Sequence, residues 1–230
     1  METVKKRLNY FGSKLLIDNM KIYKNDVLNK NELLKTFLVS HYAKDVVTKT
    51  YYDTPDNFFL NSGINIHLNV IKGKPTAELV IRYDSVKERI NFLMDMPETF
   101  SMQIPAKESI RQHLDDIAYA VNEIVPSGLY TNVDDKVRQL QPFIIAKKKR
   151  DRYKAVSNSG LKLILSFDTT EYSSPRARHK VDMELLEISS ESDRSLAKDY
   201  DDFIKNIILE KPYLVKLKTS DLFIGVEYLI

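Results

Sequence analysis

KKKRDRYK, residues 147–154, is the stretch that decides how this chain folds. It follows the apolar run of residues 143–146, which predicts the buried start of a β-strand. Because a strand turns alternate side chains to opposite faces, one face carries four cations: Lys148, Arg150, Arg152 and Lys154. Neighbouring like charges repel one another, so such a row persists at low cost only where water or a polyanion meets it. A solvated face is the simpler alternative.

The composition indicates one folded domain without disulfides. Among its 230 residues are 35 Lys and Arg and 32 Asp and Glu, which gives a net charge of +3. That charge is too small to favour nucleic acid as a general partner, and we expect no sequence-specific nucleic-acid binding. The lack of cysteine excludes disulfides, thiolate metal sites and cysteine nucleophiles. Because the sequence has no signal peptide or long apolar run, we expect a cytoplasmic protein without a membrane partner. Its oligomeric state is not set by the sequence.

Other segments alternate apolar and polar residues, or are rich in β-forming residues, as strands do. We predict strands at residues 2–10, 48–52, 64–70, 76–83, 87–96, 143–156, 161–170, 178–185 and 215–218. Residues 105–125 have the clearest helical periodicity, and shorter helices are predicted after Asn29 or Asn31, at 134–139, and after Ser190 or Ser192. The pattern predicts a single α+β domain over residues 1–230, with about eight antiparallel strands and helices outside.

The charged faces of several strands favour a sheet that closes on itself. In an eight-stranded antiparallel β-barrel tunnel with flanking helices, the apolar faces would pack on the helices and the charged faces would line the interior. Cations there neutralise phosphate oxygens, and carboxylates bind Mg²⁺ or Mn²⁺. The residues assigned to this interior are Arg150, Arg152, Lys216, Lys218, Asp168, Asp182 and Glu184. The alternative is an antiparallel sheet with one face in water.

Six blocks of sequence carry a family resemblance. Residues 51–56, YYDTPD, are followed by residues 60–68, LNSGINIHL, and later by residues 148–153, KKRDRY. An aspartate-ended strand, an acidic strand and a lysine-rich segment follow at residues 164–168, 181–185 and 214–220. In this order the blocks resemble those of the CYTH superfamily, the triphosphate tunnel metalloenzymes, over about residues 48–220.

The resemblance implies an eight-stranded tunnel that binds a triphosphate with Mg²⁺ or Mn²⁺. Members of the family hydrolyse inorganic triphosphate, thiamine triphosphate or RNA 5′-triphosphate ends, and some cyclise ATP. By resemblance, the phosphate-binding residues would be Arg82, Lys148, Arg150, Arg152, Lys216 and Lys218. The metal ligands would be Glu2, Asp168, Asp182 and Glu184, and the catalytic residues Glu184, Asp182 and Lys6.

The sequence departs from the family pattern in three places, one of which is the strand at residues 78–82, where Arg82 is the only cation. Val4 stands where a metal-binding Glu is expected, and His67-Leu68-Asn69 replaces an Arg-x-Arg strand. We therefore keep several hypotheses. The first is a metal-dependent triphosphatase acting on inorganic triphosphate, a small triphosphate ester or a nucleotide. The alternative is a tunnel protein that binds a nucleotide or polyphosphate without turnover, and a further alternative is an adenylate cyclase.

Each candidate residue also has a purely structural interpretation. Asp182 and Glu184 can form salt bridges, and lysines such as Lys216 can protect an edge strand from aggregation. His67 can be a general base or a satisfied polar residue. Asp53 and Asp56 are expected to shape the turn in which they lie.

Overall fold

The computed structural model describes residues 11–17, 21, 24, 28, 37–83, 98–125, 130, 132–190, 196–210, 215–217 and 221–230. The strands are β1 (Phe11–Leu16), β2 (Phe37–Asp53), β3 (Ile64–Ile71), β4 (Thr76–Tyr83), β5 (Glu98–Pro105), β6 (Gln141–Ser157), β7 (Lys162–Ser173), β8 (Val181–Ser190) and β9 (Val215–Leu217). The helices are α2 (Phe58–Asn61), η3 (Ile110–His113), α3 (Leu114–Ile124), α4 (Val133–Arg138), α5 (Ala197–Glu210) and α6 (Asp221–Leu229). The strands predicted at residues 2–10 and 87–96 lie outside the described residues.

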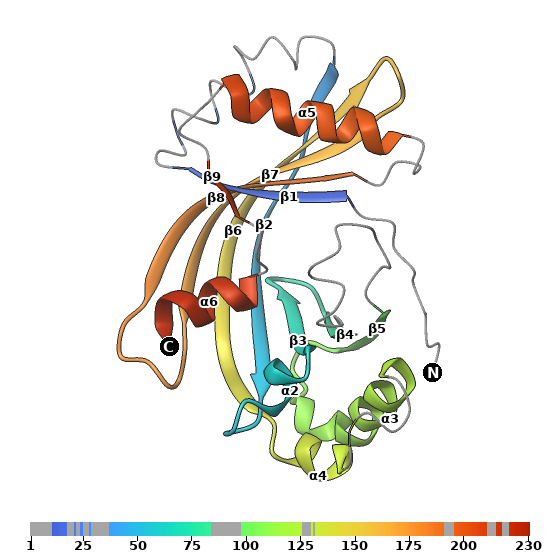
Figure 1. Cartoon of the computed structure of the whole chain (residues 1–230), viewed down its shortest axis with the longest axis vertical. Coiled ribbons are helices and arrows are strands. Elements are labelled where there is room, and N and C mark those ends of the chain that lie inside the picture. Colours follow the sequence, from blue (N-terminus) through green and yellow to red (C-terminus); the bar gives the residue numbers. More distant parts are fainter. Residues whose placement is uncertain are drawn as a thin grey trace.

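All described strands belong to one sheet, in the order β5-β4-β3-β2-β6-β7-β8-β1-β9. Every described pairing is antiparallel. The two central strands, β2 and β6, are each 17 residues long and pair along almost their whole length (Figure 1). They form the spine to which the other strands attach on either side. The KKKRDRYK stretch lies within β6, as its pattern predicted.

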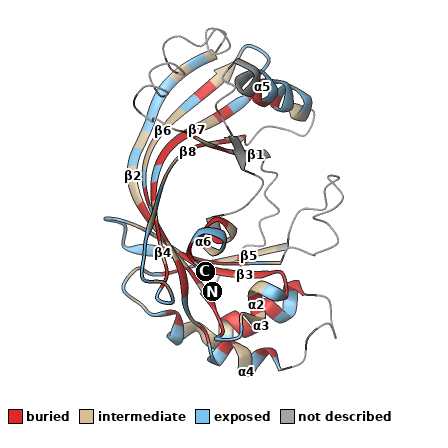
Figure 2. Ribbon diagram, turned by 60° about the vertical axis from the view of Figure 1, so that its left-hand side comes forward, coloured by how far each residue is buried: buried red, intermediate tan, exposed pale blue. Residues whose placement is uncertain are grey.

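The predicted antiparallel sheet with flanking helices is confirmed, but its closure into a barrel is not. The sheet ends at β5 on one side and at β9 on the other, and no pairing between described residues joins these two strands. In Figure 2 the strands bend into an open arc. The described architecture is therefore a strongly curved, open, mixed α/β fold instead of the expected eight-stranded barrel.

The two faces of the sheet have different neighbours. We call the face that carries Arg150 and Asp168 the inner face, and the opposite face the outer face. On the outer face, alternate residues of β3, β4 and β5 pack against α3 and α4 in one apolar cluster. A second outer cluster joins Phe167 and Leu186 to α5. None of the helices in the described part of the chain is long and apolar enough to cross a bilayer.

Helix α6 packs on one end of the inner face, where it lies inside the arc in Figure 2. Its apolar residues Leu222 and Ile224 are buried with Ile144 of β6 in a third cluster. The approach is close at Gly225, since a Cβ there would lie 2.4 Å from Ile144 Cγ2. A glycine is therefore needed at this position for the helix to reach the sheet.

The turn after β2 is organised by Asp53, as the sequence analysis expected. Its buried carboxylate accepts backbone N–H bonds from Thr54 at 2.7 Å, and from Phe59 and Leu60 at 3.0 Å each. Burial raises the pKa of Asp53, and these bonds oppose the rise. Asp56 accepts from the Thr54 hydroxyl at 2.5 Å, so both aspartates shape the turn that leads into α2.

We predict that Gly225→Ala lowers the free energy of unfolding by about 1–3 kcal/mol, because the new methyl group overpacks the contact with buried Ile144. Urea denaturation of the two proteins measures the difference. Glu227→Ala, at an exposed position of the same helix, is the control and should change the stability little.

The double variant Gly225→Ala/Ile144→Ala removes the clashing Cγ2 atom. Its loss of stability should be smaller than the sum of the two single losses. Additive losses would contradict a direct contact between the two positions.

Candidate functional site

The inner face carries the row of cations that the sequence predicted. In register, Arg150 of β6 lies between Asp45 of β2 and Asp168 of β7. Directly paired residues of an antiparallel sheet point to the same face. Two aspartates therefore flank the middle cation of the row, one from each neighbouring strand, although they are more than 100 residues apart in sequence.

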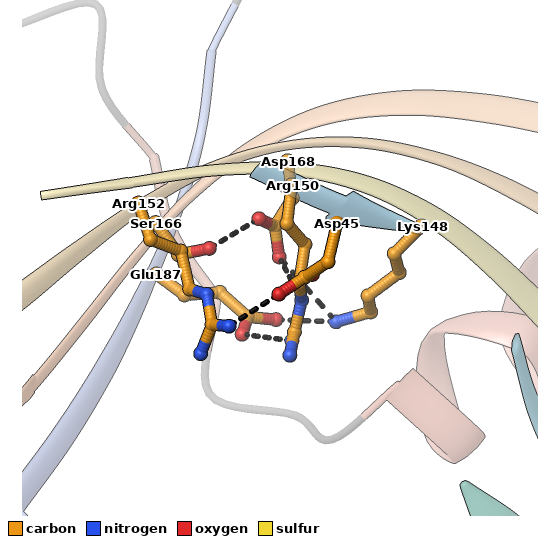
Figure 3. A network of polar contacts seen from close by, with 7 residues as sticks. All are labelled: Asp45, Lys148, Arg150, Arg152, Ser166, Asp168 and Glu187. Atoms are coloured by element: carbon orange, nitrogen blue, oxygen red, sulfur yellow. Dashed lines mark hydrogen bonds and ion pairs between the residues drawn. The ribbon is translucent and has the colours of Figure 1, made fainter. Parts of the chain in front are cut away.

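Ion pairs connect this row to a carboxylate of β8 (Figure 3). Lys148 Nζ donates to Glu187 Oε1 at 2.5 Å, and Arg150 Nη2 donates to Glu187 Oε2 at 3.1 Å. Arg150 Nε also donates to Asp168 Oδ2 at 3.2 Å, and Lys148 Nζ lies 3.9 Å from the same oxygen. Each of these two cations thus contacts both carboxylates, which makes the four side chains one connected cluster.

The network extends beyond these four side chains, still on the inner face, to Arg152, Asp45 and Ser166. Arg152 Nη2 donates to Asp45 Oδ2, and the Ser166 hydroxyl donates to Asp168 Oδ1. Asp45 Oδ1 and Arg152 Nε are buried and have no hydrogen-bond partner among the described residues. Buried polar atoms are rarely left unpaired. Within the described part of the chain, these two atoms therefore lack the partner that a buried polar atom usually has.

The cluster contains three cations, Lys148, Arg150 and Arg152, and three carboxylates, Asp45, Asp168 and Glu187. The side chains of Lys148 and Asp168 have no solvent exposure. Burying a charge is costly unless an opposite charge compensates it. The two halves of the cluster therefore hold each other in place.

The pKa of Asp168 is raised to about 6, chiefly because the carboxyl is buried and secondly because Glu187 is near. Arg150 and Lys148 oppose the rise. For Asp168, the unfavourable effects of burial and of the nearby Glu187 thus outweigh the stabilisation by the two cations. A bound cation would relieve the carboxylates further, and a bound polyanion would occupy the basic side chains that they release.

The expectation that Asp182 and Glu184 share the face of the cations is wrong. In the β7–β8 register, Asp168 pairs with Leu185, whereas Glu184 pairs with Thr169 and Asp182 with Glu171. Asp182 and Glu184 therefore point to the outer face, away from Arg150. Asp182 is exposed there and Glu184 is half-buried.

The error arose because β8 is apolar on different faces at its two ends. At the start of the strand, Val181 and Met183 pack on the inner face, in the cluster that contains α6. At its end, Leu186 and Ile188 pack on the outer face beneath α5. Sequence reasoning missed Glu187 for this reason. Its signal was the alternation Leu186-Glu187-Ile188, which matches that of the outer-face leucines of β7.

Sequence reasoning also missed Asp45. It lies at the midpoint of β2, outside the predicted strand of residues 48–52, in a stretch with no clear alternation. Only the long pairing between β2 and β6 places it opposite Arg150.

The remaining predicted residues lie elsewhere. Arg82 is on the inner face, but it is far from Lys148. The strand register shows this: Lys148 is level with Val47 of β2 and with Ile71 of β3. Arg82 pairs with Asn65, six residues before Ile71, which places it roughly 20 Å along the strands from Lys148. Arg82 is not part of the network that Figure 3 draws.

His67 is buried, with its Nδ1 3.0 Å from Asn65 Oδ1 and its ring centroid 5.1 Å from that of Tyr51. This environment agrees with a satisfied polar residue. Lys216 lies in β9, and its side chain is not among those described. Glu2, Lys6 and Lys218 lie outside the described residues.

We predict that Asp168 makes the protein less stable as the pH rises from about 4 to about 6. Between its ordinary pKa of 3.8 and its folded value of about 6, the native state binds more protons than the unfolded state. Stability therefore falls with rising pH across this window, by on the order of 3 kcal/mol. Urea denaturation of the wild type and Asp168→Asn at pH 4 to 7 tests this.

The amide of Asp168→Asn cannot ionise, so its stability relative to the wild type should rise with pH and level off near neutrality. A difference that stays constant over this range would show that burial does not raise the pKa of Asp168.

The architecture is similar to that of several solved structures. HpAC1 of Hippeastrum, a candidate adenylyl cyclase with a dominant triphosphatase activity, matches with a TM-score of 0.54 and 12% identity, over 95% of this chain and 96% of its own. A candidate adenylate cyclase from Bacillus halodurans matches with a TM-score of 0.53 and 10% identity, over 91% and 92%. A protein from Pyrococcus horikoshii OT3 matches with a TM-score of 0.50 and 13% identity, over 95% and 98%.

No family model and no curated protein matches the sequence. The similarity is thus one of fold, over nearly the whole length of each chain. The chain therefore shares the overall fold of these solved structures.

Proposed function

We propose that the protein is a metal-dependent phosphohydrolase acting on inorganic triphosphate or a small triphosphate ester. The observation that carries this proposal is the charge-balanced network on the inner face. There the row of Lys148, Arg150 and Arg152 lies against three carboxylates from three other strands. Neither the three cations nor the three carboxylates are needed for the packing of the apolar clusters.

The spacing of the row fits an elongated anion. Residues two apart in a strand lie about 7 Å from each other, so three cations line roughly 14 Å of the face. A single phosphate would engage only one or two of these side chains. A triphosphate extends along the row, and each guanidinium can bind two oxygens at once.

The carboxylates fit a metal ion that arrives with its substrate. In the described part of the chain, no group of three or more His, Cys, Asp and Glu side chains is placed to hold a metal alone. Mg²⁺ is commonly bound by one or two carboxylates together with substrate phosphates and water. Asp168 and Glu187, which share the contacts of Lys148 and Arg150, are the pair suited to this role.

The chain's own residues bind and orient the substrate. Lys148 and Arg150 would exchange carboxylate partners for phosphate oxygens and so offset the charge that grows on the transferred phosphoryl group. Asp168 and Glu187, freed from these ion pairs, would hold the metal. The chemistry that Mg²⁺ or Mn²⁺ supplies is further charge stabilisation and activation of the attacking water. Hydrolysis breaks the bond between the terminal phosphorus and its bridging oxygen, and the water oxygen takes its place.

The dominant triphosphatase activity of the Hippeastrum protein supports hydrolysis over the cyclisation of ATP. Binding without turnover is the second candidate. It is favoured by β3, which contributes His67 and Asn69 to the inner face where the family resemblance expects two arginines. The charge of the face is therefore concentrated in β2, β6, β7 and β8.

We predict that the purified protein releases phosphate from tripolyphosphate in the presence of Mg²⁺ or Mn²⁺, and that EDTA abolishes the release. Glu187→Gln should lower kcat/KM by about 100-fold, because it removes a charge that contacts both Lys148 and Arg150. Colorimetric phosphate assays give the rates.

The matched control is Glu184→Gln, the same substitution three residues earlier on the outer face. It should leave kcat/KM within about threefold of the wild type. Equal losses in the two variants would contradict the assignment of the site to the inner face. Micromolar binding of tripolyphosphate without phosphate release would favour the binding protein over the enzyme, and cyclic AMP formed from ATP would favour a cyclase.

A further inference from the structure

A β-bulge in β2 adds an aromatic side chain to the inner face. His41 pairs with Tyr153, and Ala43 pairs with the next residue of β6, Arg152, which leaves Tyr42 as the extra residue between them. In such a bulge two successive residues oppose a single partner, and the alternation of the strand is interrupted. Tyr42 and Ala43 therefore both belong to the face that Arg152 occupies.

The ring of Tyr42 lies against the two outermost cations of the row. Lys154 Nζ is 4.2 Å from the ring centroid, and Arg152 Cζ is 5.0 Å from it. Tyr42 is nevertheless 46% exposed, one of the few large apolar side chains in the described part of the chain with so much open surface. Its two cationic neighbours orient the ring, and much of it stays accessible to a ligand.

Tyr42 lies at one end of the ionic cluster. Arg152, which touches its ring, also pairs with Asp45 and follows Arg150 in the row. The aromatic ring thus begins where the three-cation row ends. A triphosphate bound along Lys148, Arg150 and Arg152 would direct its esterified end toward Tyr42.

We propose that Tyr42 stacks on the base of a nucleoside triphosphate, so that the preferred substrate is a nucleotide and not free triphosphate. This inference rests on the function proposed above. Bases stack on exposed aromatic side chains, and an arginine beside the ring strengthens such a site. A cationic ring such as that of thiamine would be repelled by Arg152 and Lys154. The charge beside the ring therefore favours a neutral base.

Two inert ligands test the proposal: β,γ-imido ATP and imidotriphosphate, which differ only by the nucleoside. Their dissociation constants are measured by isothermal titration calorimetry with Mg²⁺ for the wild type, Tyr42→Ala and Tyr42→Phe. We expect Tyr42→Ala to weaken the nucleotide analogue about tenfold. Binding of imidotriphosphate should change less than twofold, and Tyr42→Phe should bind both ligands as the wild type does. Tyr119→Ala, an exposed tyrosine on α3, is the control.

The outcomes separate this inference from the proposed function. If Tyr42→Ala weakens both ligands equally, Tyr42 only positions Arg152, and base stacking is overturned. If it weakens neither, or if the wild type binds the two ligands equally well, stacking is likewise overturned while the triphosphate site stands. Failure of the wild type to bind either ligand would overturn the proposed function itself, together with the inference drawn from it.

Discussion

The contact between Lys148, Glu187 and Asp168 is the interaction on which the inner face depends. The side chains of Lys148 and Asp168 are completely buried, and a buried charge without a partner costs several kcal/mol. The position of each group is therefore dictated by the others, through strands that are far apart in sequence. Because each buried charge needs its partners, these polar groups stay together on the inner face.

The inner face has an apolar part and a charged part. At one end α6 covers apolar residues such as Ile144, and Gly225 allows the close approach (Figures 1 and 2). Beyond it the ionic network occupies the same strands (Figure 3). The strands β6, β7 and β8 therefore change character along their length: apolar where the helix packs, charged where it does not.

Irregularities of the backbone decide which side chains reach the site. The bulge at Tyr42 reverses the alternation of β2, so that Ser40 and Asp45 lie on the same face although their positions differ by an odd number. A regular strand would have placed either Tyr42 or Asp45 on the outer face. Asp45 and Tyr42 share the inner face of β2 only because one residue is left unpaired.

The sequence by itself determined the antiparallel strands, the main helix and the shared face of Lys148, Arg150 and Arg152, because these follow from alternation within one strand or helix. It also placed Asp168 correctly, since β7 alternates without interruption. Only the tertiary structure decided that Glu187 and Asp45, and not Asp182 and Glu184, meet the cations. That choice depends on the register between strands and on where α5 and α6 pack. A shift of one residue moves a side chain to the other face, and no local pattern fixes it.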